Sequence, residues 1–304
     1  MGSENRSGNR PSCVHPAEEF PIPDFLEIPA AFLTGLAVGL VSALAGIGGG
    51  VLIVPMLYLV YSHTSVGLSG QTVAAHATSL CAGMVAALLG IRRYHHAAAI
   101  AWPFALWYGV PGVASAFLTA RIVTRLSEAG WVRTAFGVFL LISALDMIRK
   151  AVSHRDLPAA EEAARVAVPG PGRRAVLAVI GVGGGAVSAL LGIGGGLLAV
   201  PAFFYVARLP VRTVAPTSLV AVGLATMAGT AGYVSAGPGP EVSGLMAGFV
   251  DLRMAIPLAL GASLTVPLGV RLNRGFHPTT LYWIFAVLLG VLGARLAWQG
   301  LGWG

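Results

Sequence analysis

Apolar residues dominate long, nearly continuous stretches of this chain, and most of the charged residues lie between them. Seven of these stretches reach the length of about 17–25 residues that crosses a lipid bilayer as a helix. They occupy residues 30–62, 71–91, 97–120, 175–207, 211–236, 254–270 and 278–294. The pattern predicts an all-helical, polytopic membrane protein.

The composition supports the membrane prediction. Of the 304 residues, 56% are hydrophobic and 10% are charged, whereas a soluble domain has roughly a quarter of its residues charged. The net charge of +7 comes almost entirely from arginines in short links between apolar stretches. This placement is typical of membrane topology signals rather than of a nucleic-acid surface. The sequence therefore predicts a lipid bilayer and no nucleic acid as partner.

One apolar motif occurs twice in the chain. VSALAGIGGGVLIVP runs from Val41 to Pro55, and VSALLGIGGGLLAVP runs from Val187 to Pro201, 146 positions later. A Thr-Ser-Leu sequence follows each copy, beginning at Thr78 and at Thr217. Repeats of this kind indicate two homologous units. The predicted organisation is a polar tail (1–29), a first transmembrane repeat (30–150), a polar linker (151–172), a second repeat (173–298) and a C-terminal tail (299–304).

Each repeat is predicted to hold four apolar segments, of which the first is longer than one ordinary membrane span and contains GIGGG near its middle. Consecutive glycines destabilise a helix, each by about 1 kcal/mol relative to alanine. The segment is therefore either a broken helix that still crosses the membrane or a re-entrant hairpin with the glycines at its tip. Segment length and the distribution of basic residues favour the hairpin, which places Arg93, Arg174 and Arg271 on one side, predicted to be cytoplasmic.

The glycines have several alternative interpretations. A phosphate-binding loop requires a lysine after the glycines, which both copies lack. GVGGGA at 181–186 fits a dinucleotide fingerprint, but it lies within a membrane-length apolar stretch. The pairs Gly35 and Gly39, and Gly181 and Gly185, have the spacing of close helix packing. No nucleotide or other cofactor is predicted.

The central GIGGG motifs are better explained by an anion site. A new apolar helix begins after each motif, and its first backbone N–H groups lack intrahelical partners and carry partial positive charge. Exposed glycine amides at such a helix end can bind an anion without a buried cation. A purely structural bend is the alternative. The candidate substrate-binding residues are Gly46, Gly48, Gly49, Gly50 and Pro55 in the first copy, and Gly192, Gly194, Gly195, Gly196 and Pro201 in the second.

Two hydroxyl pairs extend this candidate site. Thr78 and Ser79, like Thr217 and Ser218, could cap a helix, bond back to the preceding turn or bind substrate oxygens. His76 has no counterpart in the second repeat and is predicted to make a local polar contact.

Two charged residues in apolar segments are interpreted as anchors at the membrane interface. Asp146 and Arg295 occupy equivalent positions near the ends of the last spans, where a charged residue can anchor at the interface.

GLSG around Ser69 has the form of an intramembrane protease nucleophile, with His76 or His277 as base, but no histidine lies in a later apolar segment. The chain is not expected to be an enzyme. No metal site is predicted in the chain, although a carrier of metal cations is an alternative function.

The two GIGGG-x-x-x-x-P copies, each followed by Thr-Ser-Leu, resemble the TauE/SafE family of sulfite exporters, and the resemblance covers residues 30–298. It implies a multi-pass permease of the bacterial inner membrane that moves a small sulfur-containing anion such as sulfite, sulfonate or sulfoacetate. The implied mechanism is secondary transport in the export direction, and another small anion is the alternative substrate. The expected partners are this anion and the bilayer, with a second copy of the chain as a further candidate.

Overall fold

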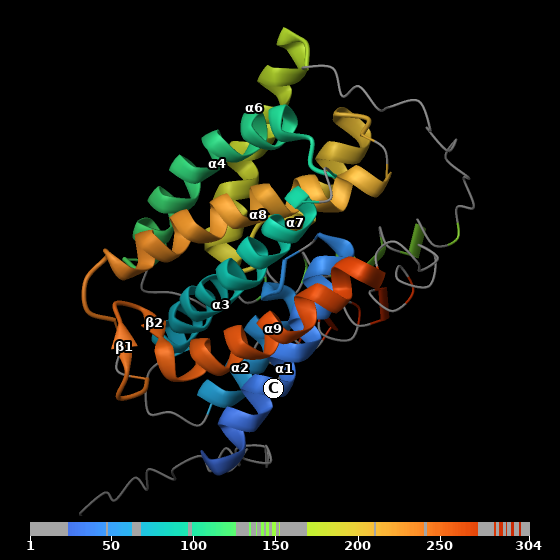
Figure 1. Cartoon of the computed structure of the whole chain (residues 1–304). Coiled ribbons are helices and arrows are strands. Elements are labelled where there is room, and N and C mark those ends of the chain that lie inside the picture. The colour runs from blue at the N-terminus through green and yellow to red at the C-terminus, as the bar shows by residue number, and fades with distance from the viewer. Residues whose placement is uncertain are drawn as a thin grey trace, which may run out of the picture.

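The computed structural model describes residues 24–46, 48–62, 68–96, 99–125, 169–209, 211–239 and 242–272, with individual positions between 134 and 152 and between 283 and 298. Most of the predicted inter-repeat linker, most of the two tails, and Asp146 and Arg295 lie outside the described residues. Nearly all of the described chain is helical (Figure 1). The elements are α1 (Asp24–Ala45), α2 (Gly50–Tyr61), α3 (Leu68–His96), α4 (Trp102–Val123), α6 (Pro171–Leu191), α7 (Gly196–Pro201), the π-helix η1 (Ala202–Val206), α8 (Val211–Val234), β1 (Met246–Ala247), β2 (Val250–Asp251) and α9 (Leu252–Leu272).

The predicted all-helical membrane class is confirmed. Six of the described helices, α1, α3, α4, α6, α8 and α9, are long and apolar enough to cross a membrane. The exception to the helical architecture is a two-residue antiparallel pairing of β1 with β2, which the hydrophobic pattern does not predict. Four helices begin earlier than the apolar stretches do: α1 at Asp24, α3 at Leu68, α6 at Pro171 and α9 at Leu252. Pro171 is the first residue of its helix, where a missing N–H costs nothing.

The first long apolar segment turns back on itself. Its helix α1 ends at Ala45, and α2 begins at Gly50. Near the start of α1, Glu27 forms an ion pair of 3.4 Å with Arg253 in the first turn of α9. At the end of α2, the Tyr61 hydroxyl donates a hydrogen bond of 2.9 Å to Asp251, the residue before α9. Both ends of the segment therefore lie at the same end of α9, which is the geometry of a hairpin.

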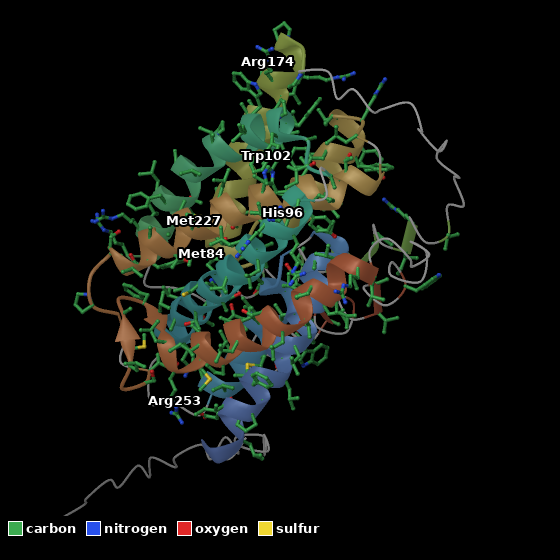
Figure 2. All side chains as sticks on the ribbon, viewed as in Figure 1. Met84, His96, Trp102, Arg174, Met227 and Arg253 are labelled. Carbon is green, nitrogen blue, oxygen red and sulfur yellow. The ribbon has the colours of Figure 1, made fainter. Side chains whose placement is uncertain are left out.

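The second long apolar segment makes an equivalent hairpin from the opposite end. Leu177, near the start of α6, packs in one hydrophobic cluster with Phe203 of η1 and with Ala207, the residue after η1. The same cluster holds Ala101 and Phe104 at the start of α4. Helix α3, whose 29 residues make a helix of about 44 Å, contacts both hairpins. Figure 2 shows Arg253, beside the first hairpin, and Arg174, in the second, at opposite ends of the molecule.

Each hairpin packs against a helix of the other half of the sequence. Helix α1 runs alongside α9, where Gly35 contacts the backbone of Leu258 and Gly39 that of Ala262. Helix α6 runs alongside α4, where Gly181 contacts the backbone of Tyr108. A side chain on any of these three glycines would collide with the neighbouring backbone, which confirms their predicted role in close helix packing. The two halves of the sequence therefore interlock.

Candidate functional site

The two GIGGG motifs form tight turns between helices. Gly46 and Gly48 in the first turn have φ values of 66° and 90°, and Gly192, Gly194 and Gly195 in the second have values of 69°, 81° and 74°. Residues with a Cβ rarely adopt this left-handed region, which costs them roughly 1–2 kcal/mol. The five glycines are also buried. The motif therefore needs glycine for the backbone path of the turn as well as for its lack of a side chain.

The two turns lie against each other in the centre of the protein. A Cβ placed on Gly50 would collide with the carbonyl oxygen of Gly192, and one placed on Gly48 would lie 2.9 Å from the carbonyl oxygen of Ile193. A Cβ on Gly192 would in turn lie 2.7 Å from the Cα of His76. The two turns are therefore in direct backbone contact.

The serine of each Thr-Ser pair binds the turn of the other half. Ser79 donates a hydrogen bond of 2.8 Å to the carbonyl oxygen of Gly192, and Ser218 donates one of 2.7 Å to that of Gly46. Ser218 also reaches the carbonyl oxygen of Ala215 at 3.0 Å. A serine hydroxyl has one hydrogen to donate, and in this conformation it is directed to a backbone carbonyl. Ser79 therefore ties the second turn to α3, and Ser218 ties the first turn to α8.

The threonine of each pair binds the backbone just before a membrane-length helix. Thr78 accepts a hydrogen bond of 2.9 Å from the N–H of Asp251, which precedes α9. Thr217 accepts one of 3.1 Å from the N–H of Ala101, which precedes α4. Both threonines are fully buried. In both Thr-Ser pairs, the threonine thus binds the start of a helix and the serine binds the glycine turn of the other half.

Loss of one of these serine hydroxyls is expected to weaken the contact between the halves. Ser79→Ala and Ser218→Ala should each lower the free energy of unfolding by about 0.5–2 kcal/mol, because a buried carbonyl loses its donor. Thermal denaturation of the purified variants in detergent measures the change. Ser263→Ala is the matched control, since the Ser263 hydroxyl bonds within its own helix, to Ala259 at 2.6 Å. Equal stability of all three variants and the wild type would contradict the bracing role.

The two prolines of the motif lie away from the tips of the hairpins. Pro55 is buried within α2, one and a half turns after Gly50. Pro201 ends α7, and the chain continues as the π-helix η1. Gly49 and Gly195 are the residues that precede α2 and α7, and Gly196 is the first residue of α7. The first N–H groups of α2 therefore point toward the turns, where the helix dipole adds partial positive charge.

A buried polar network adjoins the first hairpin. His76 is fully buried in α3, and its Nε2 atom forms a hydrogen bond with the Tyr58 hydroxyl of α2. The predicted local polar contact of His76 is therefore present. Nearby, Asp251 is also buried and accepts hydrogen bonds from Tyr61 at 2.9 Å and from Ser243 at 2.7 Å. Asp251 was not predicted from the sequence; its signal was an acidic residue just before an apolar stretch, where it caps a helix.

The residues of the protease alternative are only partly described. Ser69 lies in the first turn of α3 rather than in the loop that the sequence suggested, and His277 lies outside the described residues. The Nε2 atom of His76 is engaged by Tyr58. Within the described ranges, no group of three or more His, Cys, Asp or Glu residues is placed to hold a metal ion.

The protein has membrane-length helices and two broken segments that enter from opposite ends and meet at a glycine-lined junction. This architecture is that of a multi-pass membrane transport protein of the broken-helix type. Comparison with known families agrees with this class. The chain belongs to the sulfite exporter TauE/SafE family, whose model matches residues 31–296.

Two relatives extend over most of the chain. One is "Probable membrane transporter protein MJ0441" of Methanocaldococcus jannaschii, which is 25% identical over 268 residues, covering 88% of this chain and 94% of the relative. Another is "Probable membrane transporter protein YunE" of Bacillus subtilis, 26% identical over 274 residues, covering 88% of this chain and 96% of the relative. No solved structure matches the chain.

Proposed function

We propose that this protein is a secondary transporter that exports a small sulfur-containing anion, such as sulfite, a sulfonate or sulfoacetate, across the inner membrane of the cell. The contact between the two GIGGG turns is the observation that carries the proposal. Each turn presents bare glycine backbone to the other, with Gly50 against Gly192. Backbone amides at the start of a helix favour an anion, and sulfite offers several oxygen acceptors to such amides.

Transport requires the turns to separate. The backbones of Gly48 and Ile193 already lie close together, so an anion between the turns must displace one hairpin from the other. The tip of each hairpin is tied to a helix of the opposite half by a serine hydrogen bond, from Ser79 or from Ser218. A rocking movement that separates the turns has to break and remake these two directional bonds. Alternating access through such movement is common in transporters with broken helices.

The proposal is tested by flux through the purified protein in proteoliposomes. We expect saturable transport of radiolabelled sulfite that is competed by sulfonates and sulfoacetate. Protein-free liposomes give the background. Flux of inorganic phosphate, or of a divalent cation such as Ni²⁺ or Zn²⁺, with none of any sulfur-containing anion would contradict the proposed substrate class and favour one of the alternative carriers.

A further inference from the structure

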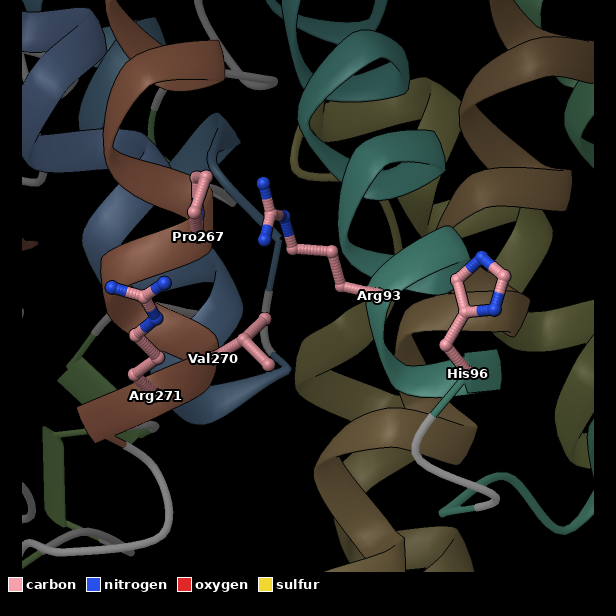
Figure 3. A pocket seen from close by; sticks show the side chains of 5 residues that line it. All are labelled: Arg93, His96, Pro267, Val270 and Arg271. Carbon is pink, nitrogen blue, oxygen red and sulfur yellow. The ribbon is translucent and has the colours of Figure 1, made fainter.

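A basic pocket of about 310 Å³ lies between the C-terminal ends of α3 and α9. Arg93 and His96 line it from α3, and Pro267, Val270 and Arg271 line it from α9 (Figure 3). In Figure 3 the Arg93 side chain extends from α3 toward α9. From the sequence alone, Arg93 and Arg271 are topology signals. The pocket brings them together from segments far apart in the chain.

The charge of the pocket is unbalanced within the described part of the protein. Arginine stays protonated in proteins, so Arg93 and Arg271 contribute two positive charges. The acidic residues in the described ranges are Asp24, Glu27 and Asp251, and all three lie at the opposite end of the molecule, near the starts of α1 and α9. A concave surface that carries charge of one sign concentrates ions of the other sign. The pocket is therefore suited to an anion.

The last turn of α1 lies beside this pocket. Tyr94, next to Arg93, donates a hydrogen bond of 2.7 Å from its hydroxyl to the carbonyl oxygen of Ala43. Gly269, next to Val270, contacts the backbone of Leu40 and the side chain of Ala43. Ala43 lies two residues before the end of α1, and the first GIGGG turn follows directly. The pocket thus lies on the side of the protein toward which the tip of the first hairpin points.

An apolar layer separates the pocket from the turn. Gly90 lies one turn before Arg93 on α3, and a Cβ at Gly90 would meet the side chains of Leu219 and Val266. Val266 directly precedes the pocket residue Pro267. Leu219 directly follows Ser218, whose hydroxyl binds the carbonyl oxygen of Gly46 in the turn. Helix α8 therefore contacts α3 one turn below Arg93 through Leu219, and the glycine turn through the neighbouring Ser218.

The equivalent position at the other end of the protein is closed. Thr78 and Thr217 pair α3 with α8 at an offset of 139, so the counterpart of Arg93 is Gly232. Leu258, which contacts Gly35, and Tyr108, which contacts Gly181, pair α9 with α4 at an offset of 150, so the counterparts of Pro267 and Val270 are Phe117 and Ala120. A Cβ on Gly232 would lie 2.8 Å from both the Phe117 carbonyl oxygen and the Ala120 Cβ, so α4 and α8 are in close contact there. The two ends of this pseudo-symmetric structure therefore differ: one is a basic pocket and the other is packed.

We propose that the pocket lined by Arg93, His96 and Arg271 is the loading port of the transporter, which binds a small oxyanion before it reaches the glycine turns. This inference rests on the proposed anion transport. The port lies on the side that the arginine distribution predicts to be cytoplasmic, so it takes up substrate from the compartment that an exporter must clear.

The port is tested with the double variant Arg93→Gln/Arg271→Gln in proteoliposomes. We expect the KM for sulfite to rise about tenfold at low ionic strength, because the pocket no longer concentrates the anion. The maximal rate should stay within about twofold of wild type, and added salt should raise the KM of the variant less than that of the wild type. The matched control is Arg92→Gln, which removes an exposed arginine next to Arg93 that does not line the pocket. An unchanged KM in the double variant, or an equal rise in Arg92→Gln, would overturn the port.

Two further measurements distinguish the port from a lipid headgroup site and from an anion pocket without transport. The kinetics are repeated in vesicles of phosphatidylcholine alone and in vesicles that also contain phosphatidylglycerol. An effect of the double variant only with the anionic lipid identifies a lipid headgroup site and overturns the port.

Thermal shift of the detergent-purified protein with sulfite measures binding without transport. Binding that needs Arg93 and Arg271 in a protein without sulfur-anion flux keeps the anion pocket and rejects the proposed function. Normal sulfite flux with unaltered kinetics in the double variant keeps the proposed function and rejects the port.

Discussion

The Gly50→Ala variant is expected to lose anion flux, although the substitution adds a single methyl group. That methyl group would collide with the carbonyl oxygen of Gly192 and lie 2.5 Å from the Cα of Ile193. The atoms that it meets are backbone atoms of the opposite turn, which cannot rotate away as a side chain can. Gly50 does not have a positive φ, so the effect comes from the collision between the turns. We expect flux of sulfite in proteoliposomes to fall to background.

Gly83→Ala is the matched control for this variant. Gly83 lies within α3, and a Cβ there would be 3.9 Å from the Thr226 methyl carbon, an ordinary contact. Alanine in a helix interior is favoured over glycine by about 0.5–1 kcal/mol, so this control should keep its flux and unfold at the same or a higher temperature. Wild-type flux in Gly50→Ala would show that the turns do not form the transport site in the arrangement described.

The Gly181→Leu variant is expected to lose its folded structure. Gly181 lies on α6 where that helix crosses α4, and a side chain there would enter the backbone of Tyr108. Overpacking of side chains commonly costs about 1–3 kcal/mol, and separation of two backbones that pack over most of their length should cost at least the upper value. We expect aggregation on size-exclusion chromatography in detergent.

The same helix provides the control. Gly183 is exposed on α6, and a Cβ there would meet nothing within 4 Å. Gly183→Leu makes the same chemical change two residues away on a surface that faces away from α4, and we expect a monodisperse protein of wild-type stability. A monodisperse, stable Gly181→Leu protein would contradict the close packing of α4 and α6.

Much of the architecture was predictable because it follows from the period and length of apolar stretches. The membrane class, the helices and the close packing of Gly35, Gly39 and Gly181 could all be derived from composition and spacing. The tail and linker boundaries, Asp146 and Arg295 remain predictions. The short pairing of β1 with β2 was missed, because two residues on each side give no alternating pattern.

The candidate site was predictable in its residues but not in its contacts. The duplicated GIGGG motif indicated two turns, and the duplicated Thr-Ser pair indicated hydroxyls nearby. The sequence left open whether Ser79 and Ser218 would cap, bond back or bind substrate, because those roles depend on which carbonyl lies within reach. The fold places the carbonyl of Gly192 beside Ser79 and that of Gly46 beside Ser218.

Hydrophobic length and the backbone freedom of glycine are local properties, so they already indicate a helical membrane protein with two glycine turns. The interlocking of the two halves, the contact of Gly50 with Gly192 and the pocket shared by Arg93 and Arg271 emerge only in the folded protein. These contacts join residues more than a hundred positions apart. Their formation depends on how whole helices cross, which no local pattern specifies.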